Sequence, residues 1–115
     1  MKIIEAIQCI DFPCTEARQE SYIVPDIDID PQSIKVMLIS ETAPIEAKDY
    51  YYSSCEALFA RTTVQAFQEA GVKVNTIQDL LHKGIYLTTA VKCGKNDYAV
   101  ATSTIAHCSA LLERE

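Results

Sequence analysis

One run of eight residues, SIKVMLIS from Ser33 to Ser40, constrains the fold of this chain more than any other stretch. It has the length of a strand, and it is almost continuously apolar and rich in β-branched side chains. Such runs are typical of parallel strands with both faces covered, because a strand with one solvated face alternates apolar and polar residues. The run therefore predicts a central strand of a parallel sheet.

Two helices are predicted after this strand. Ser53 and Glu56 form a capping-box signature, and apolar residues at helical spacing follow them until Gly71, which is a typical C-terminal stop. Thr76 then precedes a second, shorter helical pattern that ends at Gly84.

A second apolar run, from Ile85 to Val91, predicts another strand, and apolar residues at helical spacing from Ser103 onward predict a last helix. The order strand, helices, strand, helix is typical of a βαβ unit. We therefore predict an α/β fold, with a three-layer α/β/α arrangement around a central parallel sheet.

A sheet of two strong strands has unpaired edges and little covered surface. Residues 1–115 are therefore expected to be the incomplete N-terminal part of a larger α/β domain, or to pair with a partner chain that completes the sheet. The alternative is that weaker strands near Tyr22 and Val72 fill the sheet.

The composition excludes two classes of protein. A net charge of −6 argues against a generic nucleic-acid-binding surface, because such a surface needs clustered Lys and Arg to neutralise phosphates. No apolar run is long enough to span a membrane, and Glu5 and Gln8 interrupt the apolar N-terminus, unlike in a secretion signal. We expect a cytoplasmic protein.

The chain has five cysteines, and in a reducing compartment metal binding or redox chemistry is commoner than disulfides. Cys9 and Cys14 lie close together, whereas Cys93 follows the second strand and Cys108 lies in the last helix. Two close thiols and two distant ones can complete a four-sulfur site for zinc or for an iron–sulfur cluster. The alternative is that each cysteine is a small buried apolar side chain, which we expect for Cys55.

The stretches KVMLISETAP, FQEAGV, IYLTTAVKC and HCSALLERE follow one another along the chain. In this order they resemble the N-terminal half of the uracil-DNA glycosylase superfamily, in its iron–sulfur branch, often called family 4. The first resembles that branch's first strand and motif loop, and the third its strand ending in Val-Lys-Cys. The other two resemble the end of its intervening helix and the helix that carries the last cluster cysteine.

This resemblance implies a cofactor and a reaction. The cofactor is a [4Fe-4S] cluster with a structural role, held by Cys9, Cys14, Cys93 and Cys108, with zinc as the alternative. The reaction is hydrolysis of the N-glycosidic bond of uracil or another deaminated base in DNA repair, so the implied partner is DNA that contains a damaged base.

The resemblance also implies site residues. Glu41 matches the family's motif-loop Glu and is the candidate catalytic carboxylate; the alternative is a solvated loop acid. Tyr51 or Tyr52, or the preceding Tyr50, would stack on a flipped base, unless these side chains are ordinary packed tyrosines. Thr89 occupies the position of the family's base-reading asparagine, and its hydroxyl cannot offer the paired donor and acceptor of an amide.

The family's second catalytic motif, a histidine-containing loop, matches neither His82 nor His107, which we interpret as surface residues or neighbours of the metal site. We therefore expect little or no glycosylase activity from residues 1–115 alone. The alternative function is a non-catalytic α/β module or binding protein stabilised by its metal.

Overall fold

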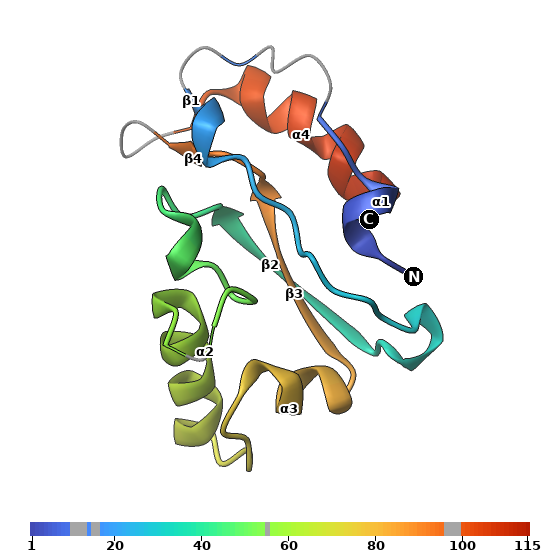
Figure 1. Ribbon diagram of the computed structural model, residues 1–115, viewed down its shortest axis with the longest axis vertical. Helices are drawn as coiled ribbons and strands as arrows, with labels where there is room; N and C mark the ends of the chain where they lie inside the picture. The colour runs from blue at the N-terminus through green and yellow to red at the C-terminus, as the bar shows by residue number, and fades with distance from the viewer. Residues whose placement is uncertain (10–13, 15–16, 55, 96–99) are drawn as a thin grey trace.

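Two strands, β2 (Val36–Thr42) and β3 (Ile85–Val91), pair in parallel at the centre of the protein in its computed structural model (Figure 1). The structure describes residues 1–9, 14, 17–54, 56–95 and 100–115. The register places Leu38 beside Leu87 and Ser40 beside Thr89. The predicted α/β fold with a parallel pair of strands is therefore confirmed.

The remaining elements surround this pair. They are α1 (Ile3–Ala6), β1 (Ala17–Arg18), α2 (Leu58–Glu69), α3 (Ile77–His82), β4 (Gly94–Lys95) and α4 (Thr102–Arg114), with short 3-10 helices at Gln19–Ser21, Pro31–Ser33 and Ala47–Asp49. β1 and β4 form a separate antiparallel pair. Among the described residues, the regions near Tyr22 and Val72 add no strand to the main sheet, so the alternative that they fill it is wrong for this part of the chain.

β3 is the buried strand of the pair. Leu87 belongs to a cluster with residues of α2, α3 and the segment before α2, whose members are Tyr50, Tyr51, Ala57, Ala60, Val64, Val74, Ile77, Leu80 and Leu87. Tyr86 belongs to a second cluster, with Ile3, Ile7 and Val24. Because neighbouring residues of a strand point to opposite faces, the two clusters cover the two faces of β3.

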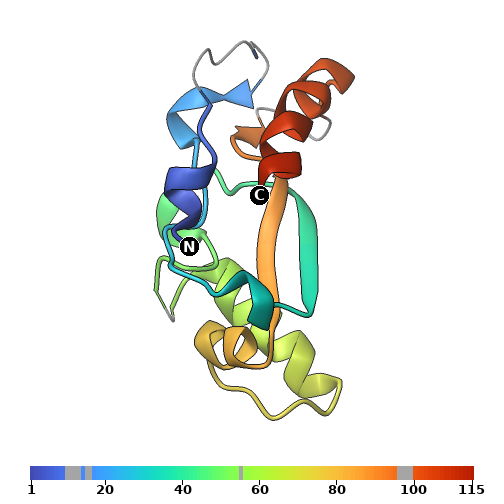
Figure 2. The same ribbon diagram turned by 90° about the vertical axis from the view of Figure 1, so that its right-hand side faces the viewer.

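β2 differs from its prediction. Its apolar side chains were expected to be covered on both faces, yet Val36 is 46% exposed, Met37 36%, Leu38 39% and Ile39 50%. At mid-height in Figure 2, β2 forms the right-hand edge of the molecule, beside β3. The prediction of a central strand is therefore wrong for the described residues, because β3 is the single neighbour of β2 among them.

The start of α2 also differs from its prediction. The helix begins at Leu58, its N-cap is Ala57, and no side chain caps it. The Ser53 hydroxyl instead donates to the Ala47 carbonyl. The predicted end is confirmed, since Gly71 has a φ of 90°, the left-handed conformation typical of a helix stop.

The predicted start of α3 is confirmed. Thr76 Oγ1 accepts from the Asp79 N–H at 3.1 Å, and the Asp79 carboxylate accepts in return from the Thr76 N–H at 3.1 Å, which completes a capping box. The helix leads to Gly84, whose φ is 84° and where a Cβ atom would lie 2.7 Å from the Ser33 carbonyl oxygen. Glycine is therefore required at the turn into β3.

α4 is the last element of the chain and packs against β3. It begins at Thr102, one residue before the predicted start. None of the helices in the described parts of the chain is both long and apolar enough to cross a membrane.

Candidate functional site

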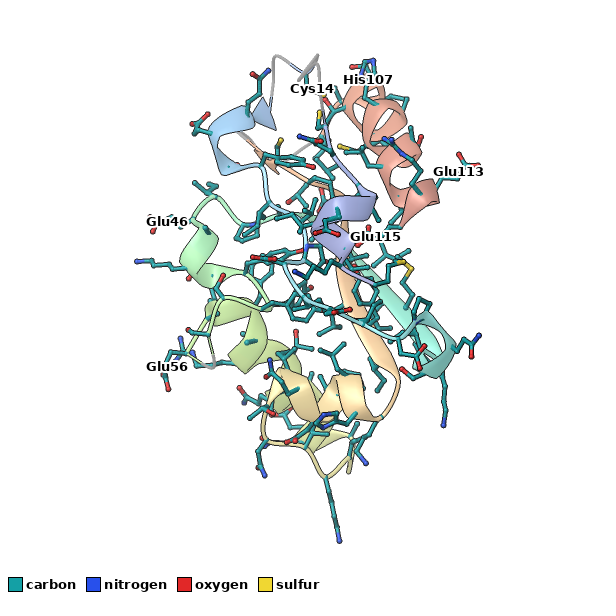
Figure 3. The ribbon with its side chains drawn as sticks, turned by 45° about the vertical axis from the view of Figure 1, so that its right-hand side comes forward. Cys14, Glu46, Glu56, His107, Glu113 and Glu115 are labelled. Atoms are coloured by element: carbon teal, nitrogen blue, oxygen red, sulfur yellow. The ribbon has the colours of Figure 1, made fainter. Side chains whose placement is uncertain are left out.

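The four cysteines that were predicted to act together come from four places in the fold. Cys9 follows α1, Cys93 lies between β3 and β4, and Cys108 lies on α4; Cys14 lies at the end of the molecule where the N-terminal segment passes α4 (Figure 3). Cys93 and Cys108 are buried, and the other two are partly exposed. Cys55, which was predicted to be a simple core residue, lies outside the described residues.

These thiols lie near enough to influence one another. Burial and, after it, the neighbouring Cys108, Cys9 and Cys14 together raise the pKa of Cys93 to about 12. Burial also raises the pKa of Cys108, to which Cys14 and Cys9 add. The four cysteines therefore lie near enough for their charges to interact, and their joint binding of a metal stays a prediction.

Two groups of Lys92 oppose this rise in the pKa of Cys108. The Lys92 backbone N–H forms a hydrogen bond with the Cys108 thiol, and the Lys92 ammonium lies near it; both lower the pKa of Cys108. An N–H donor and a cation stabilise a thiolate. They are also the groups that commonly surround metal-bound sulfur.

The donor set fits a metal site in number and chemistry. Four thiolates are the usual ligands of a [4Fe-4S] cluster and of one class of structural zinc site. Within the parts of the chain that the structure describes, no three His, Cys, Asp or Glu side chains stand close enough together to hold one metal ion. Metal binding would therefore require the thiols to lose their protons and to close on the metal.

A buried ion pair lies next to this region. The ammonium of Lys92 lies 2.5 Å from the Glu115 carboxylate, and both side chains are fully buried. Lys92 Nζ also donates to Thr88 Oγ1 at 2.9 Å and to the Thr89 carbonyl at 2.6 Å. Thr88 and Tyr86 donate their hydroxyls to the same carboxylate, so the ion pair is held by hydrogen bonds on both sides.

Sequence reasoning assigned no role to Lys92 or Glu115. The signal for Lys92 was a lone charged residue at the end of an apolar strand, where burial requires a partner. Glu115 lies 23 residues further along the chain, and no local pattern links the two residues.

The carboxyl ends of β2 and β3 bring several other predicted site residues together. Ser40 lies beside Thr89 in the sheet, and Glu41 follows Ser40 with an exposed side chain. Thr89 is fully buried, and its hydroxyl donates to the Val91 carbonyl at 2.8 Å. Thr89 could reach a substrate only after this region opens.

The predicted stacking residues are both packed in the core. Tyr51 donates its hydroxyl to Ser40 Oγ at 2.9 Å, and its ring lies 5.3 Å from that of Phe59. Tyr52 donates to the Leu87 carbonyl at 2.8 Å and accepts from the Leu87 N–H at 2.9 Å. This packing is typical of core tyrosines, so stacking on a base would require a ring to leave its present contacts.

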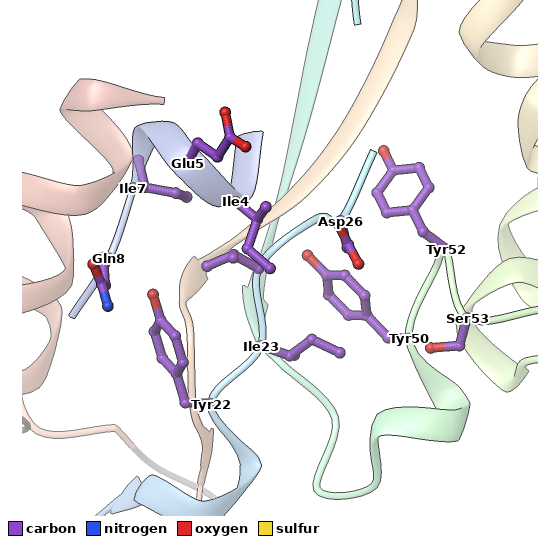
Figure 4. Close-up of a pocket in the computed structure, with 11 residues that line it drawn as sticks. Ile4, Glu5, Ile7, Gln8, Tyr22, Ile23, Asp26, Tyr50, Tyr52 and Ser53 are labelled. Carbon is purple, nitrogen blue, oxygen red and sulfur yellow. The ribbon is translucent and has the colours of Figure 1, made fainter. Parts of the chain in front are cut away.

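A pocket of about 840 Å³ lies between the N-terminal segment and the segment before α2 (Figure 4). Tyr22, Tyr50 and Tyr52 line it together with the acidic Glu5 and Asp26. The Tyr50 hydroxyl, which faces Thr88, makes no hydrogen bond of ordinary geometry among the described residues, and burial raises its pKa. Of the predicted site residues, Tyr50 and Tyr52 line this pocket, whereas Glu41 and Thr89 at the carboxyl ends of the strands do not.

Comparisons with known proteins add no family. No protein-family model, curated protein or solved structure matches the chain. What the chain does must therefore be inferred from its own residues and their arrangement.

Proposed function

We propose that residues 1–115 form the N-terminal part of a cytoplasmic DNA-repair protein that resembles uracil-DNA glycosylases and has their three-layer α/β/α fold. Its four cysteines, Cys9, Cys14, Cys93 and Cys108, hold a [4Fe-4S] cluster, with zinc as the alternative metal. The observation that supports this proposal is that Cys93 and Cys108 are buried in the same region of the fold. Cys9 and Cys14, far away in the sequence, lie near enough to raise the pKa of both buried thiols.

The cluster has a structural role in this proposal. Cys9 and Cys14 belong to the N-terminal segment, whereas Cys93 and Cys108 belong to the end of β3 and to α4. A metal bound by all four would therefore fasten the N-terminal segment to the sheet and the last helix. The free energy of metal binding then contributes to folding, as in other structural metal sites.

The catalytic part of the proposal concerns the carboxyl ends of β2 and β3, where open α/β sheets usually bind ligands. A damaged base would leave the DNA stack and enter this region. Water then forms a bond to C1′ of the sugar while the bond from C1′ to the base nitrogen breaks; the base leaves with the bonding electron pair and takes up the proton that the water loses. Glu41 is the carboxylate that stabilises the cationic sugar or orients the water, and Thr89 and one of Tyr51 and Tyr52 contact the base.

The metal can be tested without any activity. The chain purified without oxygen should be brown and should contain about four irons per molecule. The substitutions C93S and C108S should each remove the colour and the iron, whereas the matched control C55S should retain both. Colourless protein with one tightly bound zinc would replace the cluster by zinc, and protein without metal would overturn the site.

The activity should be tested with the product of the complete reading frame that contains these residues. DNA with uracil, hypoxanthine or xanthine, single- and double-stranded, is incubated with the protein and then cleaved at abasic sites. We expect base release, and E41Q should slow it by about 10²–10⁴-fold, as loss of a catalytic acid–base group does. E46Q, at an exposed acid in the segment that follows β2, should leave the rate unchanged.

Absence of base release from protein with its metal intact would favour a second function. In that case the chain is a non-catalytic α/β module stabilised by its metal. The burial of Thr89 and the bonds that engage the hydroxyls of Tyr51 and Tyr52 favour this function, because they leave these groups closed to a ligand.

A further inference from the structure

The outer edge of β2 presents backbone groups between exposed apolar side chains. The four residues from Val36 to Ile39 are each at least 36% exposed. No proline or charged side chain interrupts the strand before Glu41, although soluble proteins commonly protect an edge strand with such residues. Among the described residues no segment pairs with this edge. An edge of this kind favours the addition of another strand.

Alternate residues of β2 direct their backbone groups outward. The Val36 N–H donates to the Gly84 carbonyl at 3.0 Å, so Val36 faces β3. Because the direction of the N–H and C=O groups alternates along a strand, those of Met37 and Ile39 face away from β3. A further strand must therefore form its hydrogen bonds with these odd-numbered residues.

The charges that flank the apolar residues of β2 fit a second copy of the same strand. Lys35 and Glu41 are both exposed, and each lies three residues from Leu38 (38 − 35 = 41 − 38 = 3). Two edge strands related by a two-fold axis run antiparallel. A register centred on Leu38 places Lys35 of each copy opposite Glu41 of the other, and Met37 opposite Ile39.

The neighbouring symmetric registers lose this match. A register centred on Met37 places Lys35 opposite Ile39. A register centred on Ile39 places Glu41 opposite Met37. Each leaves a charged side chain against an apolar one, whereas opposite charges across a strand pair stabilise it. The charge pattern therefore selects the register centred on Leu38.

We propose that this chain forms a two-fold symmetric dimer in which β2 pairs antiparallel with β2 of a second copy, in the register centred on Leu38. The two sheets join into one of four strands, in the order β3, β2, β2, β3. The occupant of the edge is a second copy because the strand is complementary to itself in both its apolar residues and its charges. In this proposal a second copy, and not a further strand of the larger α/β domain, pairs with the outer edge of β2. The dimer does not depend on the proposed DNA chemistry.

Sedimentation equilibrium of the purified chain, with whatever metal it binds, over a range of concentrations tests this proposal. The chain should form a dimer that dissociates on dilution. L38K should remain a monomer, because it places two ammonium groups next to each other across the two-fold axis. In the dimer, the N–H groups of Met37 and Ile39 should exchange with deuterium more slowly as the protein concentration rises.

Charge exchange tests the register itself. K35E and E41K should each raise the dissociation constant about tenfold, because two like-charge contacts replace two attractive ones. The double variant K35E/E41K restores opposite charges and should associate like the unmodified chain. The matched controls K73E and E113K change exposed charges on other elements and should have no effect on the dimer.

Three results would overturn the proposal. The first is a monomer at every concentration, which would leave the edge to a different partner. The second is a double variant that associates as weakly as either single variant. The third is association that continues past two copies. Circular dichroism of each variant ensures that a loss of the dimer is not a loss of folding.

Discussion

β2 and β3 pair with each other residue by residue, and both are apolar, yet they differ completely in their surroundings. Leu87 of β3 is 2% exposed, whereas Leu38, its neighbour in the register, is 39% exposed. Helices α2, α3 and α4 and the N-terminal segment all supply contacts to β3. Apolar composition thus makes a strand suitable for burial, but the elements packed around it decide whether it is buried.

The largest expected effect is at the charged residue of the buried strand end. K92A leaves the Glu115 carboxylate buried without its cation and should lower the free energy of unfolding by about 3–5 kcal/mol. K35A, which precedes the exposed strand, should change it by less than about 0.5 kcal/mol. Urea denaturation of both variants measures the difference.

The same experiment has an internal check. The double variant K92M/E115L removes both charges and keeps apolar volume in their place. It should recover most of the stability that K92A loses, because the main cost lies in the unpaired charge. A double variant as unstable as K92A would show that the ion pair itself stabilises the strand.

Truncation of the two paired leucines compares the strands directly. L87A opens a cavity in the core and should cost about 2–5 kcal/mol. L38A removes an exposed side chain and should cost less than about 1 kcal/mol at concentrations where the chain is monomeric. Thermal unfolding monitored by circular dichroism measures both, and equal losses would mean that β2 is covered in solution.

A smaller difference is expected between two tyrosine hydroxyls. Y52F leaves the Leu87 N–H and C=O without their partner and should cost about 1–3 kcal/mol. Y51F removes a single bond to Ser40 of the exposed strand and should cost about 0.5–1.5 kcal/mol. Hydrogen exchange at the Leu87 N–H should accelerate in Y52F and not in Y51F.

The smallest effect concerns the helix that leads into β3. T76A removes the N-cap of α3 and should lower the free energy of unfolding by about 1 kcal/mol.

The pKa of Asp79 is lowered by the N–H groups of Asn75 and Thr76 that donate to it. Because this pKa is lower in the folded state, the ionised carboxylate stabilises the fold at pH values above the unfolded pKa of about 4. This contribution is lost as the pH falls through the folded pKa. D79N should therefore remove a part of the acid sensitivity of the unfolding free energy.

Local signals in the sequence were enough to predict the elements around β3. The bounds of β3, the cap at Thr76 and the turns at Gly71 and Gly84 all depend on residues close together in the chain, and all are as predicted. The cap at Ser53 was wrong because its hydroxyl has a competing acceptor, the Ala47 carbonyl, six residues earlier.

In the candidate site too, features that depend on nearby residues could be predicted, and features that depend on distant residues could not. A shared role for the four cysteines could be predicted because thiols have few roles in a reducing compartment, and metal binding by all four stays a prediction. The exposure of β2 and the pairing of Lys92 with Glu115 could not be predicted, because each depends on packing between segments that no local pattern connects. The base-contacting roles of Glu41, Tyr51, Tyr52 and Thr89 remain predictions.

The two hydrogen bonds between Tyr52 and Leu87 have a consequence for how large an assembly of this chain can become. The phenol hydroxyl occupies both backbone groups that an incoming strand would need at that position of β3. The outer side of β3 is therefore closed to another strand at Leu87, whereas no described residue closes the outer side of β2 in this way. In the dimer proposed above, Tyr52 of each copy would therefore oppose further growth of the sheet at Leu87, so the side chain that satisfies one residue of the core would also disfavour a fibre.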